Sequence, residues 1–220
     1  LRLRNQAYLR LGGRHRNRRT HRHYPPAHSH TLEPAVRTCT ATYGDCEALR
    51  RAVARRDTCR CRALVHALEE QLRALLRNRS HRSYAPTRTI SLEELRRIIN
   101  VNTRIPSARN QQCLRFRAVT GEENSLVLPH IKLGGALPHL HLPTAGNEPS
   151  AYIIVCSTTA EDRWVDIDLG ISAQSMLLKA TEMGLNGICI GAFNADAINN
   201  AFNLPYKPLL IIALGKGIEH

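Results

Sequence analysis

The chain has 220 residues and a formal net charge of +13, with 43% hydrophobic and 22% charged residues. This composition is typical of a globular protein and excludes full disorder. Its longest apolar runs, Ala151–Cys156 and Leu209–Leu214, are far shorter than the roughly 20 residues of a membrane span. The charged N-terminus lacks the apolar region of a secretory signal, and seven cysteines without a regular framework indicate a reducing compartment. We therefore expect a cytoplasmic protein without a membrane partner. The excess of positive charge raises the question whether it binds an anionic partner.

Basic charge is concentrated in residues 1–70, which hold 15 arginines against 6 acidic residues. Residues 1–62 are rich in Arg and His without apolar periodicity, so we predict a disordered segment, or spurious sequence translated from a mis-called start. An arm that binds nucleic-acid phosphates is the functional alternative. Against it, lysine is absent before Lys132, aromatic residues are scarce and no nucleic-acid fold is recognisable. The four cysteines here lack the paired C-x2-C spacing of a zinc site, so we expect no metal; they are Cys39, Cys46, Cys59 and Cys61.

A folded domain is predicted over residues 63–220. Leucines at helical spacing predict a first helix over Ala63–Leu76. Ser91 and Glu94 form a capping box that starts a second helix, which ends before Pro106. The later elements, in chain order, are strands over Phe116–Thr120 and Ala151–Ser157, a helix over Asp166–Met183, a strand over Gly187–Gly191, a helix over Asn194–Phe202 and a strand over Leu209–Leu214.

The ends of these elements carry their own signals. Gly184 stands where a left-handed C-cap closes the long helix, and Asn194 stands where an N-cap opens the next. The loop Ile131–Pro149, rich in Gly and Pro, is a candidate lid. Helices and strands are mixed with few clean βαβ crossovers, and no G-x-G-x-x-G follows a strand, so a Rossmann domain is not supported. The expected fold class is α+β.

Three segments could bind a ligand. The basic segment, Asn78–Tyr84, offers guanidinium forks and a hydroxyl that suit a phosphate or the edge of a heterocycle. The polar loop, Pro106–Gln112, could bond a polyol or an amide through Ser107 and Asn110. In the small-residue segment, Cys189–Phe193, a strand ends in small residues that let a planar ligand approach the backbone. Taken alone, the first two could equally be solvated loops.

Catalysis by side chains finds little support in the sequence. No Ser-His-Asp or Cys-His arrangement and no nucleophile elbow is recognisable. Asp166 and Asp168 lie two residues apart near a helix start, where carboxylates favour the helix dipole, so we interpret them as structural.

Together, the three segments resemble motifs of the FMN-dependent nitroreductase family. N-R-S-H-R-S-Y resembles the family's R-R-S-x-R-x-[FY], and P-S-A-R-N-Q-Q-C-L-R-F resembles P-S-x-x-N-x-Q-P-W-x-F. G-L-N-G-I-C-I-G-A-F-N resembles G-L-x-x-x-x-I-G-x-F, and the final strand into Gly215–Gly217 is similar to the family's last strand. The likeness runs from about Leu72 to Glu219, and the order of the motifs makes it specific.

The resemblance implies a three-layer α/β/α sandwich around a mixed, mainly antiparallel sheet. It also implies an FMN-dependent oxidoreductase that takes a hydride from NADH or NADPH and reduces a nitroaromatic, quinone or similar acceptor by a ping-pong mechanism. A homodimer is implied, with the flavin at the subunit interface. Flavin reductase or reductive dehalogenase activity on the same fold remains an alternative, as does a non-catalytic nucleic-acid- or anion-binding protein.

The family's roles carry over to matching positions of this chain. No catalytic side chain is implied, because the chemistry takes place at N5 of the flavin beside the backbone of Gly191 and Ala192. The polar loop is implied to reach the flavin, in one arrangement from the partner subunit. Asn78 and Cys113 depart from the motifs, and the family's C-terminal tail is missing, so we expect weaker FMN binding. The implied cofactor-binding residues are Arg79, Ser80, Arg82, Pro106, Ser107, Ala108, Asn110, Ile190, Gly191, Ala192 and Lys216.

Overall fold

The computed structural model describes residues 69–70, 72–134, 138–140 and 142–218. The predicted segment 1–62, with its nucleic-acid alternative, lies outside the described residues. The fold below is that of the compact unit containing Gln71–His220. Of the first predicted helix, residues 69–70 and 72–77 are described and are helical. The remaining helices and strands are α3 (Leu92–Ile99), β1 (Leu114–Thr120), β2 (Ala151–Ser157), α4 (Arg163–Glu182), β3 (Asn186–Ile190), α5 (Ala195–Phe202) and β4 (Lys207–Gly215).

The four strands form one sheet in the order β1-β2-β4-β3, and every neighbouring pair is antiparallel. The last strand in the sequence, β4, therefore lies inside the sheet, as its continuous apolar run predicts. An isolated parallel bridge between Ser80 and Gly187 extends the sheet beyond β3. The four named strands are therefore all antiparallel, where a mixed sheet was expected, and a parallel pairing occurs at this isolated bridge.

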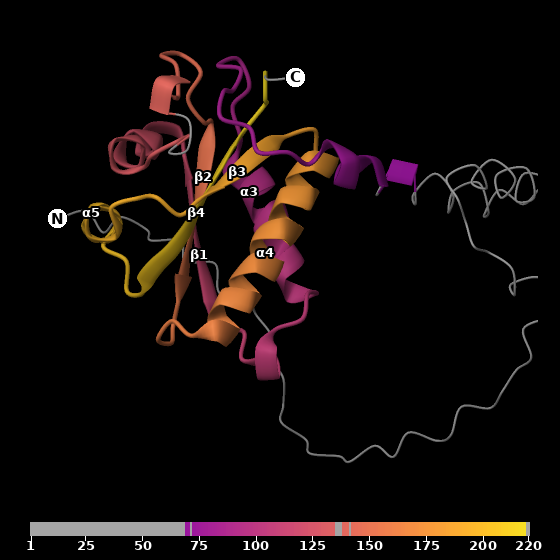
Figure 1. Ribbon diagram of the computed structural model, residues 1–220, viewed down its shortest axis with the longest axis vertical. Helices are drawn as coiled ribbons and strands as arrows, with labels where there is room; N and C mark the ends of the chain where they lie inside the picture. The colour runs from indigo at the N-terminus through magenta and orange to yellow at the C-terminus, as the bar shows by residue number, and fades with distance from the viewer. Residues whose placement is uncertain (1–68, 71, 135–137, 141, 219–220) are drawn as a thin grey trace, which may run out of the picture. The chain divides into compact units, whose positions relative to one another are not determined.

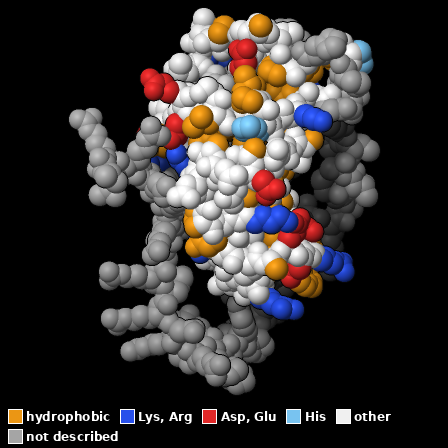
Figure 2. Space-filling view, turned by 90° about the vertical axis from the view of Figure 1, so that its left-hand side faces the viewer, with side chains coloured by type: hydrophobic (Ala, Val, Ile, Leu, Met, Phe, Trp, Pro, Cys, Tyr) orange, Lys and Arg blue, Asp and Glu red, His pale blue; other side chains and the backbone are white. Residues whose placement is uncertain are grey.

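Helices cover both faces of the sheet (Figure 1). On one face, α3 and α4 enclose a core that includes Leu95, Ile153 and Met176, each less than 1% exposed. On the other face, α5 and part of the loop after β1 enclose a second core that includes Ile154 and Ile198. The outer surface on the α5 side carries hydrophobic side chains among polar ones (Figure 2). The predicted three-layer α+β sandwich is confirmed.

Caps fix where the helices begin and end. The Ser91–Glu94 capping box is formed, with Ser91 N donating to Glu94 Oε2 at 3.0 Å and Glu94 N donating to Ser91 Oγ at 3.2 Å. Asn194 caps α5 as predicted, and Gly184 follows α4 with a φ of 75°. Asp162 caps α4, so this helix starts three residues before the predicted Asp166. Within the described residues, no helix combines the length and the apolar character that a membrane crossing would need.

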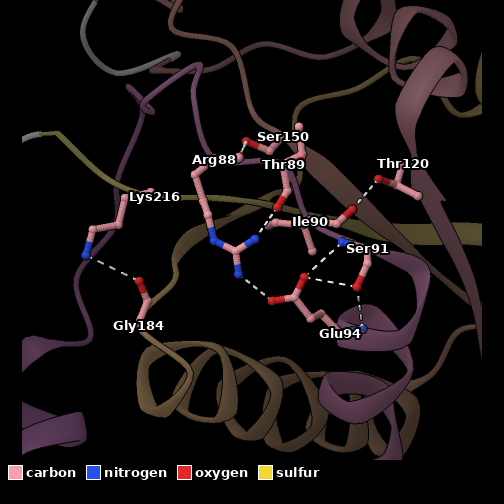
Figure 3. Close-up of polar contacts among 9 residues, drawn as sticks. All are labelled: Arg88, Thr89, Ile90, Ser91, Glu94, Thr120, Ser150, Gly184 and Lys216. Carbon is pink, nitrogen blue, oxygen red and sulfur yellow. Dashed lines mark hydrogen bonds and ion pairs between the residues drawn. The ribbon is translucent and has the colours of Figure 1, made fainter.

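Hydrogen bonds hold the strand-like approach to α3 against the sheet (Figure 3). Ser150 Oγ donates to the Arg88 carbonyl at 2.6 Å, and Thr120 Oγ1 donates to the Ile90 carbonyl at 2.6 Å. The Arg88 guanidinium pairs with Glu94, which lowers the pKa of this carboxyl from 4.5 to about 2. The capping box of α3 is thus tied to the ends of β1 and β2.

Candidate functional site

The basic segment lies at the β3–β4 end of the sheet. Ser80 pairs with Gly187 of β3, and His81 N donates to the Gly187 carbonyl at 3.2 Å. Tyr84 pairs with Gly217 just after β4, is fully buried, and donates its hydroxyl to the His81 carbonyl at 2.6 Å. These contacts hold the segment as an added edge of the sheet, with Arg79 exposed and Arg82 half-buried.

Two glycines make this close approach sterically possible. A Cβ on Gly215 would lie 2.5 Å from Tyr84 Cδ1, and one on Gly217 would overlap the His81 ring. Between them, Lys216 accepts a hydrogen bond from Ala85 N at its carbonyl. Its exposed ammonium donates to the Gly184 carbonyl at 3.4 Å (Figure 3). Lys216 therefore lies beside the basic segment, at the C-terminal end of α4.

The small-residue segment is joined to the loop after β1 by strand-like pairing. Ile131 pairs with Phe193, Lys132 N donates to the Ala192 carbonyl at 2.9 Å, and Asn194 N donates to the His130 carbonyl at 2.8 Å. We call residues 129–134 the bridging loop, because its other end reaches the basic segment. A Cβ on Gly134 would lie 3.6 Å from Arg82 Cδ.

The bridging loop thus brings the basic and small-residue segments together. Gly191 and Ala192 are exposed, and a Cβ on Gly191 would meet no atom within 4 Å. Open space therefore lies beside this backbone, directly after the buried Ile190. The family resemblance implies that the basic and small-residue segments bind the same flavin. This arrangement is compatible with that expectation for Arg79, Ser80 and Arg82 and for Ile190–Ala192.

The polar loop lies at the other end of α4. Ser107 Oγ donates to Asp168 Oδ2 at 2.7 Å, and Ala108 N donates to Asp168 Oδ1 at 2.8 Å. Gly184, which Lys216 contacts, follows Asp168 by 16 residues. At a rise of about 1.5 Å per residue, the two lie about 24 Å apart along the helix. Figure 1 shows the turns after α3 at one end of α4 and the basic segment near the other. Within one chain, the structure therefore does not bring the polar loop to the basic segment.

The polar loop holds an unusual backbone. Arg109, Asn110 and Gln112 have φ values of 53°, 54° and 48°, a region that residues other than glycine seldom adopt. Ser107 Oγ accepts from Gln112 N at 3.0 Å and so closes the loop. Such strain persists only where the surroundings impose it, and it is frequent at functional sites.

Asp168 is structural, as expected, but it acts through hydrogen bonds to the polar loop and not through the helix dipole. Its side chain is 5% exposed and anchors the polar loop, whereas Asp166 is exposed in the first turn of α4. The sequence did contain a signal, because Asp168 and Ser172 lie on the buried stripe of α4 that also carries Val165 and Met176. A small cavity of about 30 Å³ lies beside Asp168 and Ser172 and is lined in part by the polar loop.

Thiols of the described sheet strands are poor nucleophiles. Burial raises the pKa of the Cys156 thiol to about 12, and desolvation also raises the pKa of Cys189 in β3. Both are protonated at neutral pH. Among the residues that the structure describes, no group of three or more His, Cys, Asp or Glu side chains could hold a metal ion. The site offers backbone amides, guanidinium groups and hydroxyls.

The model of the nitroreductase family matches residues 139–216 of this chain. This match covers about a third of the chain and shows a similarity to the nitroreductase family over that part. A protein of Methanocaldococcus jannaschii named as a nitroreductase is 35% identical over 57 residues, which are 26% of this chain and 29% of that protein. The aligned region is therefore less than a third of the curated relative.

Solved structures share the fold at low sequence identity. A nitroreductase of Exiguobacterium sibiricum in complex with FMN has a TM-score of 0.54 and 21% identity, covering 69% of this chain and 88% of that chain. An NAD(P)H:FMN oxidoreductase of Staphylococcus epidermidis has a TM-score of 0.54 and 21% identity, covering 68% and 87%. The family match includes the small-residue segment and Lys216, while the basic segment and the polar loop precede it.

Proposed function

We propose that this protein binds FMN and takes a hydride from NADH or NADPH. It then reduces a small electrophile such as a nitroaromatic or a quinone, by ping-pong turnover in one pocket. The observation that carries the proposal is the open backbone at Gly191–Ala192, which the bridging loop connects to Arg82. The FMN complex of the Exiguobacterium neighbour supports the choice of cofactor.

The residues on this side of the fold fit FMN. Arg79 and Ser80 are exposed, Arg82 is half-buried, and guanidinium forks match the geometry of a phosphate and of the flavin pyrimidine edge. Lys216 adds a further positive charge near the basic segment. Ile190, Gly191 and Ala192 present small or flat surfaces and backbone amides to a planar ring. When bound, FMN supplies the hydride chemistry at N5, and an amide of Gly191 or Ala192 would donate a hydrogen bond there.

The position of the polar loop supports a homodimer. Pro106, Ser107, Ala108 and Asn110 can reach the same flavin as the basic segment only from a partner subunit, given the separation of about 24 Å along α4. Exposed large apolar side chains also support a dimer, because a two-fold symmetric contact between subunits would cover them. They are Leu72 (60% exposed), Leu75 (54%), Leu76 (72%), Trp164 (45%) and Ile167 (41%).

Titration of the purified protein with FMN tests the cofactor. We expect quenching of flavin fluorescence, and we expect Arg79→Ala to weaken binding about tenfold, the effect of losing one charge-assisted hydrogen bond. Arg97→Ala is the matched control, because Arg97 is also an exposed arginine but lies on α3, outside the three segments. Absence of quenching by the wild type contradicts the proposal.

Two further measurements test the mechanism and the assembly. Parallel double-reciprocal plots for NADH or NADPH and an acceptor would support ping-pong turnover, and intersecting plots would contradict it. Sedimentation of the wild type should give a dimer. A mixture of Arg79→Ala and Asn110→Ala subunits should regain part of the FMN binding, because the mixed dimer keeps one site with both side chains intact.

A further inference from the structure

A cavity of about 500 Å³ opens between the bridging loop and the start of α5. It is lined by residues 129–132 and 192–194. The second group leads into α5, on the side of the molecule that faces the viewer in Figure 2. This volume lies in the range of pockets that hold small organic molecules. The cavity shares Ala192 with the proposed flavin site, so a molecule in it would lie next to that site.

Strand pairing fixes which side chains share the cavity wall. The hydrogen bonds from Lys132 N and Asn194 N flank the Ile131–Phe193 pair, which is therefore a non-hydrogen-bonded antiparallel pair. Ile131 and Phe193 pack against the second core. Because side chains alternate along such a pair, Lys132 stands opposite Ala192 and His130 opposite Asn194, on the other face.

The ammonium group of Lys132 differs from those of the other three lysines. Lys179 pairs with Glu182, Lys207 pairs with Glu161, and Lys216 donates to the Gly184 carbonyl. The exposed Lys132 has no ion pair or side-chain hydrogen bond among the described residues. No acidic residue lines the cavity either, and the nearest acid in the sequence, Asp196, lies in the first turn of α5.

We infer that this cavity binds the anionic group, a carboxylate or a phosphate, of a small planar substrate, with Lys132 as its donor. The ring would lie against Ala192, which shares a face with Lys132, and His130 on the same face can donate a second hydrogen bond. The inference rests on the proposed function, because Ala192 borders both sites. The anion can come from a carboxylated acceptor or from the phosphate that distinguishes NADPH from NADH.

The acceptor arm uses 4-nitrobenzoate and its neutral analogue 4-nitrobenzamide, with affinities measured by calorimetry. We expect the wild type to bind the carboxylate about tenfold more tightly, the effect of one charge-assisted hydrogen bond. Lys132→Met should abolish this preference, and Lys207→Met, which removes an equal charge from an exposed lysine elsewhere, should keep it. Equal affinities in the wild type, or an unchanged preference in Lys132→Met, would overturn an acceptor carboxylate as the ligand.

The cofactor arm compares KM for NADPH and NADH in the same three proteins. Suppose that the wild type prefers NADPH, that Lys132→Met removes this preference, and that the acceptor arm shows no preference for the carboxylate. The anion is then the phosphate of the nucleotide. If Lys132→Met changes neither preference, the inference is wrong.

A flavin titration of each protein separates this inference from the proposed function. Normal FMN binding by Lys132→Met with a lost anion preference supports both. Normal FMN binding with no anion preference in the wild type overturns the anion site alone. Loss of FMN binding in Lys132→Met would place Lys132 in the cofactor site and overturn the inference. Failure of the wild type to bind FMN overturns the proposed function and, with it, the assignment of the anion to a substrate.

Discussion

Replacing Asp168 with alanine should release the polar loop. The substitution removes the acceptors of two hydrogen bonds, from Ser107 Oγ at 2.7 Å and Ala108 N at 2.8 Å. Hydrogen bonds to a charged group contribute about 1.5–3 kcal/mol each. Three left-handed residues, which cost on the order of 1–3 kcal/mol each, favour the open loop in the wild type and the variant alike and do not add to this difference. Water replaces part of the lost hydrogen bonding, so we expect the free energy of loop opening to fall by about 3 kcal/mol.

Trypsin can report on this opening, because Arg109 is an exposed cleavage site inside the loop. If cleavage follows the population of the open loop, about 3 kcal/mol corresponds to cleavage about 100-fold faster. Mass spectrometry of the fragments assigns the cut to Arg109, and urea unfolding measures global stability in parallel. Asp168→Asn keeps one acceptor and should fall between the wild type and alanine.

Asp166→Ala is the matched control for this experiment. Asp166 is an exposed acid on the same helix, two residues earlier, so its removal should change the free energy of unfolding by no more than about 0.5 kcal/mol. Equal cleavage rates after Arg109 in Asp168→Ala and Asp166→Ala would refute the reasoning. The polar loop would then be held by contacts other than the Asp168 carboxylate.

Two further predictions concern stability. The stabilisation that the ionised Glu94 gains from Arg88 is present above its usual pKa of 4.5 and is lost as the pH falls toward about 2; with solvent screening we expect about 1 kcal/mol. Urea midpoints of the wild type and Glu94→Gln should therefore converge between pH 5 and 2.5, and a constant difference would contradict this. Gly215→Ala should destabilise the protein by about 1–3 kcal/mol, because the new Cβ meets the buried Tyr84 ring. Gly170→Ala, in open space on α4, should stabilise it by about 0.5–1 kcal/mol, and equal effects of the two would be inconsistent with the packing described.

Elements encoded by neighbouring residues could be predicted from the sequence. The capping box at Ser91 and the strand Ala151–Ser157 were both located correctly, because each signal lies within a few residues of the structure it specifies. The C-cap at Gly184 is a signal of the same local kind.

Contacts between distant residues could not be predicted in this way. The anchoring of Ser107 by Asp168 spans 61 residues, and the two lie in segments that look ordinary when each is considered alone. Residues 131–134 of the bridging loop were expected only as part of a candidate lid, and the pairing of this loop with Ala192 depends on where the sheet places both segments. The roles assigned to the site residues remain predictions.

The position of β4 has a consequence for biosynthesis. Because β4 is the last strand of the sheet to be translated and lies between β2 and β3, the nascent chain carries two unpaired strand edges until Lys207–Gly215 leave the ribosome. The basic segment also gains its partners at Gly215 and Gly217 only then, more than 130 residues after its own synthesis. Ribosome stalling before β4 would therefore leave apolar edges exposed to other chains, and such arrested products should depend on chaperones far more than the released protein does.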